Sequence, residues 1–104
     1  MRQQMDYYKV VTEDMKSLGL RKNPNILQFE KEKWVYEENP QPGNQDSGGI
    51  WVANGKGNAH TLKKYMQEKS VTTKLFAVEI GKILYSNSYR TKTNKVRLLY
   101  EVLN

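Results

Sequence analysis

The sequence predicts an α+β protein, with a mainly antiparallel sheet of about five to six strands and one principal helix packed on it. Three observations predict this class. Segments with alternating apolar residues recur along the chain, one segment alone has helical spacing, and no regular alternation of strands and helices indicates a parallel sheet. With 104 residues, of which 38% are hydrophobic and 27% charged, the chain has the size of a single domain, residues 1–104, with its own core.

The first strand is predicted at Met5–Val11, where β-branched and aromatic residues alternate between two faces. Residues 12–24 contain turn-forming residues around a short charged stretch, which predicts a loop with at most one helical turn. Ile26–Phe29 and Lys33–Glu37 flank a charged tripeptide, so they form either a hairpin or an irregular strand followed by a regular one. Residues 38–49 are dense in Pro, Gly, Asn and Asp, which predicts a long surface loop.

The central unit is a strand, a glycine-rich loop and a helix. Ile50–Ala53 is a short apolar run, and the residues from Asn54 to Asn58 form the loop. Beyond it Ala59, Leu62 and Met66 recur at helical spacing, and Asn58 is a favourable N-cap residue. The sequence therefore predicts a helix over residues 59–69.

The last third of the chain reads as strands. Thr73–Ile80 alternates, Gly81 and Lys82 interrupt the pattern, and Ile83–Tyr85 resumes it, which predicts a bulge or a tight hairpin. After the polar residues 86–94, a final strand with alternating apolar residues begins near Val96.

Composition excludes several classes of protein. The chain has no cysteine and one histidine, so disulfide frameworks, thiol nucleophiles, thiolate metal sites and His-rich metal sites are excluded. No cofactor is predicted. Neither a membrane span nor a signal sequence is recognisable, and we expect a cytoplasmic protein without a membrane partner.

The net charge of +6 is carried entirely by the second half of the chain. Residues 1–57 hold eight basic and eight acidic side chains, whereas residues 58–104 hold nine basic and three acidic ones. Such asymmetry predicts an anionic partner, namely nucleic acid, a nucleotide or an acidic protein, because a surface of one sign attracts the opposite charge. A lysine-rich face that only promotes solubility is the alternative.

Two groups of residues are candidates for anion binding. The first is the loop before the helix, with Lys56 and Gly57, together with His60, Lys63 and Lys64 on the following helix face. Free backbone N–H groups, a helix N-terminus and lysines together suit an anion. The alternative is a plain glycine turn between strand and helix.

The second group is the basic stretch of residues 90–97, which contains Arg90, Lys92, Lys95 and Arg97 without an acidic residue. Tyr85 and Tyr89 lie just before it, and Trp51 is a further candidate aromatic contact. A basic edge flanked by aromatic residues suits phosphates and stacked bases. Alternatively, its lysines protect an exposed edge strand from aggregation.

Two resemblances follow from the order of these motifs. The first resemblance is carried by five segments, namely Tyr8–Val10, Gly49–Ala53, the helix with Leu62 and Met66, Leu75–Ile80 and Lys95–Leu99. In this order they resemble small proteins of phages and mobile elements. The lysine-rich, asparagine-rich composition is typical of low-GC bacteria and their phages.

The same order is distantly similar to the core of ADP-ribosyltransferase-like domains, in which such elements frame a nicotinamide dinucleotide. The resemblance implies roles for Trp51, in stacking on nicotinamide, and for Glu101, in stabilising an oxocarbenium ion. The opening strand lacks the Arg or His that grips the dinucleotide in that family, which implies a degenerate relative.

We therefore expect a non-enzymatic binding protein for an anionic partner. An ADP-ribosyltransferase-like enzyme and an inhibitor that occludes the surface of a host enzyme are the alternatives.

Overall fold

The computed structural model describes residues 6–18 and 26–103, which form seven strands and one helix. The elements follow in the order β1 (Tyr7–Thr12), β2 (Trp34–Tyr36), β3 (Ile50–Asn54), α1 (Gly55–Glu68), β4 (Thr73–Ile80), β5 (Ile83–Ser86), β6 (Arg90–Thr93) and β7 (Lys95–Glu101). This confirms the α+β class, with more strands than the five to six predicted. Met5, the first residue of the predicted opening strand, lies outside the described residues.

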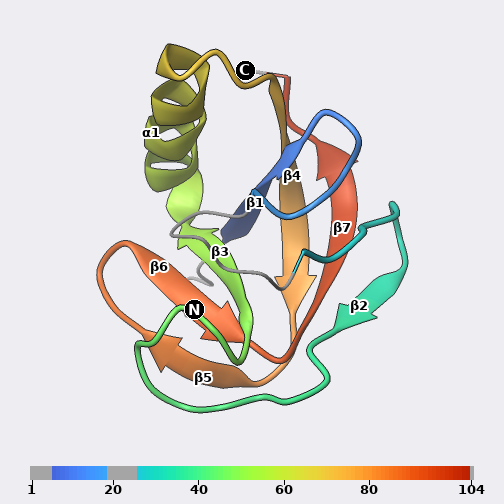
Figure 1. Ribbon diagram of the computed structural model, residues 1–104, viewed down its shortest axis with the longest axis vertical. Coiled ribbons are helices and arrows are strands. Elements are labelled where there is room, and N and C mark those ends of the chain that lie inside the picture. Colours follow the sequence, from blue (N-terminus) through green and yellow to red (C-terminus); the bar gives the residue numbers. More distant parts are fainter. Residues whose placement is uncertain (1–5, 19–25, 104) are drawn as a thin grey trace, which may run out of the picture.

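All seven strands belong to one antiparallel sheet with the order β2-β7-β4-β1-β3-β6-β5. The opening strand β1 lies between β4 and β3, although both follow it in sequence (Figure 1). It pairs with β4 over its whole length but with β3 at only two positions, Tyr7 with Asn54 and Tyr8 with Ala53. Beyond these two positions, β1 and β3 do not pair with each other.

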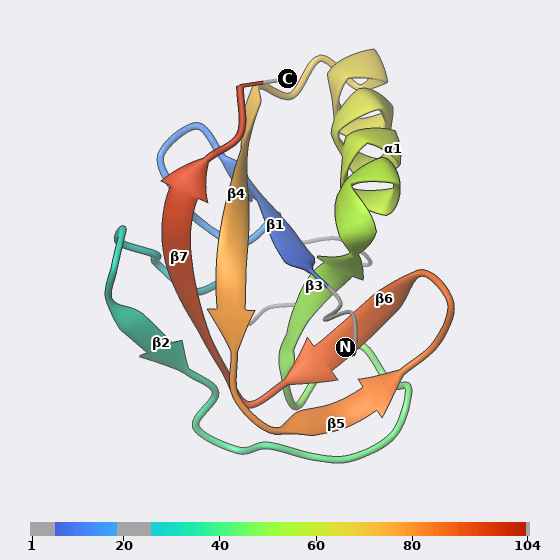
Figure 2. The same ribbon diagram turned by 180° about the vertical axis from the view of Figure 1, so that it is seen from behind.

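The sheet is strongly bent. One long hairpin, with β4 and β5 as one arm and β6 and β7 as the other, contributes strands to both halves of the sheet. Only Gly81 and Lys82 separate β4 from β5, and only Asn94 separates β6 from β7. Figure 2 shows both transitions at the same corner of the molecule. The predicted interruption at Gly81 and Lys82 is thereby confirmed, but the alternative of a tight hairpin there is wrong, because β4 pairs with β1 and β7 whereas β5 pairs with β6. The bend instead carries the chain from the β4–β7 pair to the β5–β6 pair.

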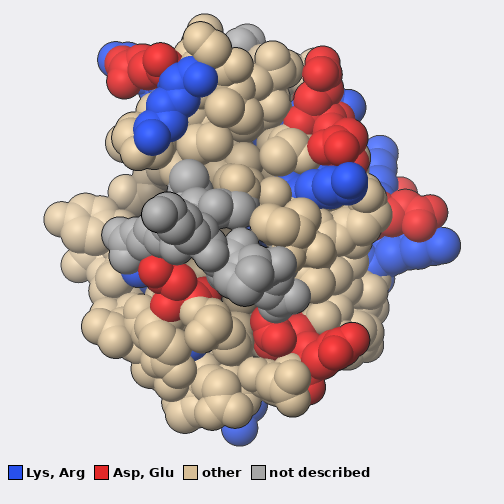
Figure 3. Space-filling view, in the orientation of Figure 1, with Lys and Arg blue, Asp and Glu red and all other residues tan. Residues whose placement is uncertain are grey.

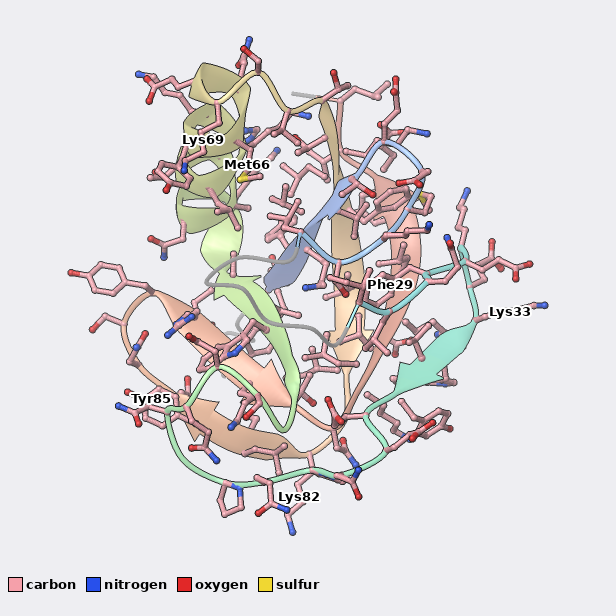
Figure 4. The ribbon with its side chains drawn as sticks, viewed as in Figure 1. Phe29, Lys33, Met66, Lys69, Lys82 and Tyr85 are labelled. Carbon is pink, nitrogen blue, oxygen red and sulfur yellow. The ribbon has the colours of Figure 1, made fainter. Side chains whose placement is uncertain are left out.

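Two apolar clusters lie on opposite faces of this bent sheet. One contains Val11, Phe29, Phe76, Leu98 and their neighbours. The other lies between the sheet and α1, where Val10, Ala53 and Leu75 meet Ala59. In Figure 4 the Met66 side chain points from α1 towards the sheet, whereas Lys33 points away from the molecule.

The helix begins four residues earlier than predicted. Gly55 is its first residue and has a φ of 84°, a conformation that glycine adopts without strain. The residue before it, Asn54, is the N-cap but makes no side-chain capping bond. Its side chain instead donates to Asn87 O (2.6 Å) and accepts a bond from Thr91 Oγ1 (2.7 Å). The predicted N-cap, Asn58, lies inside the helix, and the predicted loop is largely its first turn.

The predicted basic edge is not an edge of the sheet. β6 lies between β3 and β5, and β7 lies between β2 and β4. The sequence suggested a polar segment at residues 86–94, but Thr91 and Thr93 are fully buried within β6. Their hydroxyl groups are satisfied by Asn54 and by Lys82 O, so polar side chains are accommodated in the interior.

Gly49 is buried because the Lys92 side chain crosses directly over it. A Cβ atom at position 49 would lie 2.3 Å from Lys92 Cγ, so Gly49→Ala is expected to lower the free energy of unfolding by about 1.5 kcal/mol. Gly57→Ala is the control, since a Cβ there meets nothing within 4 Å. It should stabilise the helix by up to about 1 kcal/mol. Chemical denaturation measures both, and equal effects would contradict this packing.

Within residues 6–18 and 26–103, no helix is long and apolar enough to cross a membrane.

Candidate functional site

A cavity of about 560 Å³ lies beside α1 and the strands β1 and β3. It is situated where β1 and β3 cease to pair, so the sheet itself opens towards it. Its described lining residues come from β1, β3, the first three turns of α1, the start of β6 and the loops that contain Leu18, Leu27 and Asp46, and most of its walls are apolar or aromatic. The aromatic side chains among them are Tyr8, Trp51, Tyr65 and Tyr89.

Trp51 and Arg90 form one wall of this cavity. The Arg90 guanidinium carbon lies 3.7 Å from the centre of the Trp51 ring, within the range of a cation–π contact. The register explains the contact, because Trp51 pairs with Lys92 and Arg90 is the diagonal neighbour on the same face. Asp46 holds both side chains: its carbonyl accepts a bond from Trp51 Nε1 (3.0 Å), and its carboxylate lies 3.7 Å from Arg90.

Tyr85 and Lys92 support Trp51 from β5 and β6. The rings of Tyr85 and Trp51 meet edge to face at 5.9 Å, and Figure 4 shows Tyr85 on β5. The Lys92 ammonium lies 5.8 Å from the Trp51 ring and donates to Gln45 O (3.2 Å) and Ser47 O (3.0 Å). Burial lowers the pKa of Lys92. Lys92 therefore anchors the loop before β3 and is not a free surface cation.

Lys9 on β1 also lines the cavity, although only 9% of it is exposed. Its ammonium donates to Trp51 O (2.7 Å), a carbonyl on β3 near the point where pairing with β1 has ended. It also lies 5.6 Å from the centre of the Phe29 ring. Burial lowers the pKa of Lys9 to about 8.

The helix presents a different face to the cavity from the one predicted to bind an anion. The cavity is lined by Asn58, Thr61, Leu62 and Tyr65. The residues predicted to bind an anion lie elsewhere on the helix surface. Lys63 donates to Thr73 O (2.9 Å). The described lining of the cavity contains neither Lys63 nor the other predicted residues, which are Lys56, Gly57, His60 and Lys64. Helical spacing grouped these residues correctly with one another, but the cavity opens on another side.

The predicted basic stretch is divided between two clusters. Arg90 and Lys92 contact Trp51, whereas Lys95 and Arg97 lie on β7 beside Trp34. The Lys95 ammonium is 4.4 Å from the Trp34 ring, and Arg97 forms an ion pair with Glu79. The corner at Asn94 separates the clusters, so the four cations do not form one surface.

The charge asymmetry of the sequence does not produce one basic patch on the face shown in Figure 3. Lysine and arginine side chains lie mainly towards its rim, next to acidic ones. On this face, basic and acidic side chains are thus mixed.

Some of the site residues predicted from the sequence lie in this cavity. The cavity contains Trp51, Tyr89 and Arg90 from the predicted set, with Tyr85 behind Trp51. Glu101, the exposed last residue of β7, is not among the described lining residues. Trp51 and Glu101, to which the resemblance to ADP-ribosyltransferase-like domains gives roles, are therefore not brought together by the described lining. Lys9 and Asp46 were missed. A lysine on the same strand face as Tyr7 and Val11 was the available signal for Lys9, since buried apolar faces seldom include one.

No group of three or more His, Asp or Glu side chains lies together among the described residues, so no metal centre is assigned to them. Comparison of the chain with models of known families, with curated proteins and with solved structures found no significant match. Function is therefore argued from the cavity itself.

Proposed function

We propose that this protein binds a small anionic ligand with a planar ring, of the nucleotide class, in the cavity beside α1. The observation that carries the proposal is the contact of Arg90 with Trp51, 3.7 Å from guanidinium carbon to ring centre, in the wall of a cavity of about 560 Å³. Of the anionic partners that the sequence predicts, the cavity favours the smallest.

The form of the site supports a small molecule over a macromolecule. Small-molecule sites are concave, mainly apolar and typically about 300–1,000 Å³ in volume, with a few polar groups that orient the ligand. This cavity has that volume, aromatic walls and polar groups at Asn58, Thr61 and Arg90. A nucleic acid or an acidic protein would bind to an extended basic surface, and the predicted cations are divided between two clusters.

The chemistry of the wall supports an anion attached to a ring. Arg90 offers a planar guanidinium that recognises phosphate or carboxylate in a bidentate manner. Its described contacts are the Trp51 ring and the Asp46 carboxylate, and this ion pair at 3.7 Å is looser than a direct hydrogen bond. Aromatic side chains at the same site provide stacking partners for a base.

Fluorescence of Trp51 tests the proposal. In a Trp34→Phe background Trp51 is the only tryptophan, and we expect ADP to quench it with saturation, whereas adenosine and inorganic phosphate alone bind more weakly. Arg90→Gln should weaken ADP binding about tenfold, which corresponds to about 1.4 kcal/mol.

Arg97→Gln is the matched control, because it removes an arginine that contacts the other tryptophan, Trp34, outside the cavity. It is made in the chain with Trp34 intact and measured by calorimetry alongside Arg90→Gln. Equal losses in the two variants, or no saturable binding of ADP at millimolar concentration, would contradict the proposal. Tighter binding of an oligonucleotide than of ADP at about 50 mM salt would favour a nucleic-acid partner instead.

A further inference from the structure

We propose that Lys9 is a reactive amine that captures an aromatic aldehyde in the cavity as an imine. The ligand class is an aldehyde on a planar ring that carries an anionic group. This inference goes beyond the proposed nucleotide-class binding and does not depend on it.

The position of Lys9 is the first observation. Lysine is rarely buried, yet this one lies on the central strand β1, is 9% exposed and contributes to the cavity wall. Its ammonium is held by Trp51 O at 2.7 Å and faces the Phe29 ring at 5.6 Å. The amine is thus held against the backbone of Trp51, a residue that itself lines a space large enough for a ring.

The electrostatic surroundings of Lys9 are the second observation. Among the described residues no carboxylate lies within ion-pair distance of its ammonium, and the charged residues that share the cavity, Asp46 and Arg90, pair with each other. Burial without a counter-charge lowers the pKa of Lys9 to about 8. At pH 7 roughly a tenth of Lys9 is therefore the neutral amine, compared with fewer than about one in a thousand for an ordinary lysine.

The reaction needs no partner other than the aldehyde. Lys9 loses a proton to water, and its nitrogen lone pair attacks the carbonyl carbon to form a carbinolamine. The hydroxyl group then takes up the equivalent of that proton and leaves as water while the C=N bond forms, so the ammonium and the aldehyde become a protonated imine and one water.

Trp51 O favours this product. The ammonium donates one hydrogen bond to that carbonyl, and the protonated imine retains one N–H that can make the same bond. This partly buried carbonyl thus keeps its partner throughout, which avoids the penalty for an unsatisfied polar group. Tyr8, Trp51 and Arg90 supply the aromatic and cationic walls that favour an anionic ring.

Reductive trapping tests the inference. The protein is incubated at pH 7.5 with a limiting amount of 4-carboxybenzaldehyde and reduced with borohydride, and the modified lysines are located by peptide mass spectrometry. The chain has thirteen lysines, so the other twelve are internal controls. We expect Lys9 to carry at least ten times the label of any other lysine, and its labelling to level off above pH 8 while that of exposed lysines still rises.

An even distribution of label over the exposed lysines, or an unmodified Lys9, would overturn the inference. Lys9→Met should lose the dominant product and retain its circular dichroism spectrum, whereas Lys64→Met should be labelled as the wild type is. If Lys9→Met does not fold, the map on the wild-type protein decides.

The test also separates this inference from the proposed function. Labelling of Lys9 without ADP binding would uphold the amine and refute the nucleotide-class ligand. ADP binding without labelling would do the reverse. Protection of Lys9 by ADP would place both in the same cavity.

Discussion

Replacement of Lys92 by alanine is expected to lower the free energy of unfolding by about 3 kcal/mol, the largest effect among the substitutions proposed. Lys92 is completely buried in β6, and its aliphatic stem packs over Gly49. Its ammonium donates to the carbonyls of Gln45 and Ser47. Alanine leaves a cavity above Gly49 and removes the donor for both carbonyls.

Two further variants separate packing from hydrogen bonding at this position. Lys92→Met keeps most of the stem, so we expect it to lose about half as much stability as Lys92→Ala. Lys64→Ala removes an exposed lysine from α1 and should change stability by less than about 0.5 kcal/mol. Urea denaturation gives these values. If Lys92→Ala resembles Lys64→Ala, Lys92 does not anchor the loop.

Hydrogen exchange provides a second readout for the same change. The Gln41 and Gly43 amides donate to Gly48 O (2.8 Å) and Leu84 O (3.4 Å), which ties the loop to itself and to β5. Lys92→Ala should increase exchange at these amides more than in the helix, because the loop loses its anchor first.

The stability of the protein is expected to rise by about 2 kcal/mol between pH 7.5 and 9.5 through Lys9 alone. Burial lowers the pKa of Lys9 from 10.5 to about 8 in the folded chain. Between these two values the unfolded chain binds a proton that the folded chain has already released. Raising the pH therefore favours the folded state until Lys9 is neutral in both.

Denaturant unfolding at several pH values measures this rise as the difference between the wild type and Lys9→Met, because the lowered pKa of Lys92 adds a rise of the same sign to both chains. Lys56→Met is the control for the loss of one lysine, since Lys56 is exposed in the first turn of α1. Burial, reinforced by Asp6, raises the pKa of Tyr8, and this tyrosine affects stability only above about pH 10, outside the measured interval. A wild-type slope equal to that of Lys9→Met would contradict a buried ammonium.

Much of the fold was predictable because the burial of one face of a strand or helix produces a regular spacing of apolar residues along the chain. The alternation in Tyr7–Val11 and Thr73–Ile80 and the helical spacing of Ala59, Leu62 and Met66 each identified an element. The break at Gly81 was predictable because Gly81 and Lys82 interrupt the alternating pattern. The structure adds a steric reason for glycine, since a Cβ there would lie 2.3 Å from Asn94 Oδ1.

The strand β6 could not be predicted in the same way. Its buried positions Thr91 and Thr93 are polar, and their partners Asn54 and Lys82 are distant in sequence. The N-terminus of the helix was misplaced for a related reason. Asn58 has a suitable side chain for an N-cap, but the backbone already turns at Gly55, where a φ of 84° is allowed.

The sequence alone was sufficient for the order of strand, glycines and helix in residues 50–68, though not for the first residue of the helix, because each part has a local signal: an apolar run, glycines and helical spacing. The same holds for the aromatic and basic character of Trp51, Tyr89 and Arg90. The contact between Arg90 and Trp51 depended on tertiary structure, since the register of β3 and β6 places the Arg90 side chain over the Trp51 ring.

The cavity itself depended on tertiary structure as well. It opens where β1 and β3 stop pairing, and it includes a lysine from the start of the chain that no local pattern connects to Trp51. The position of the site is therefore determined by pairing between strands that are distant in sequence, and not by the order of charged residues along the chain.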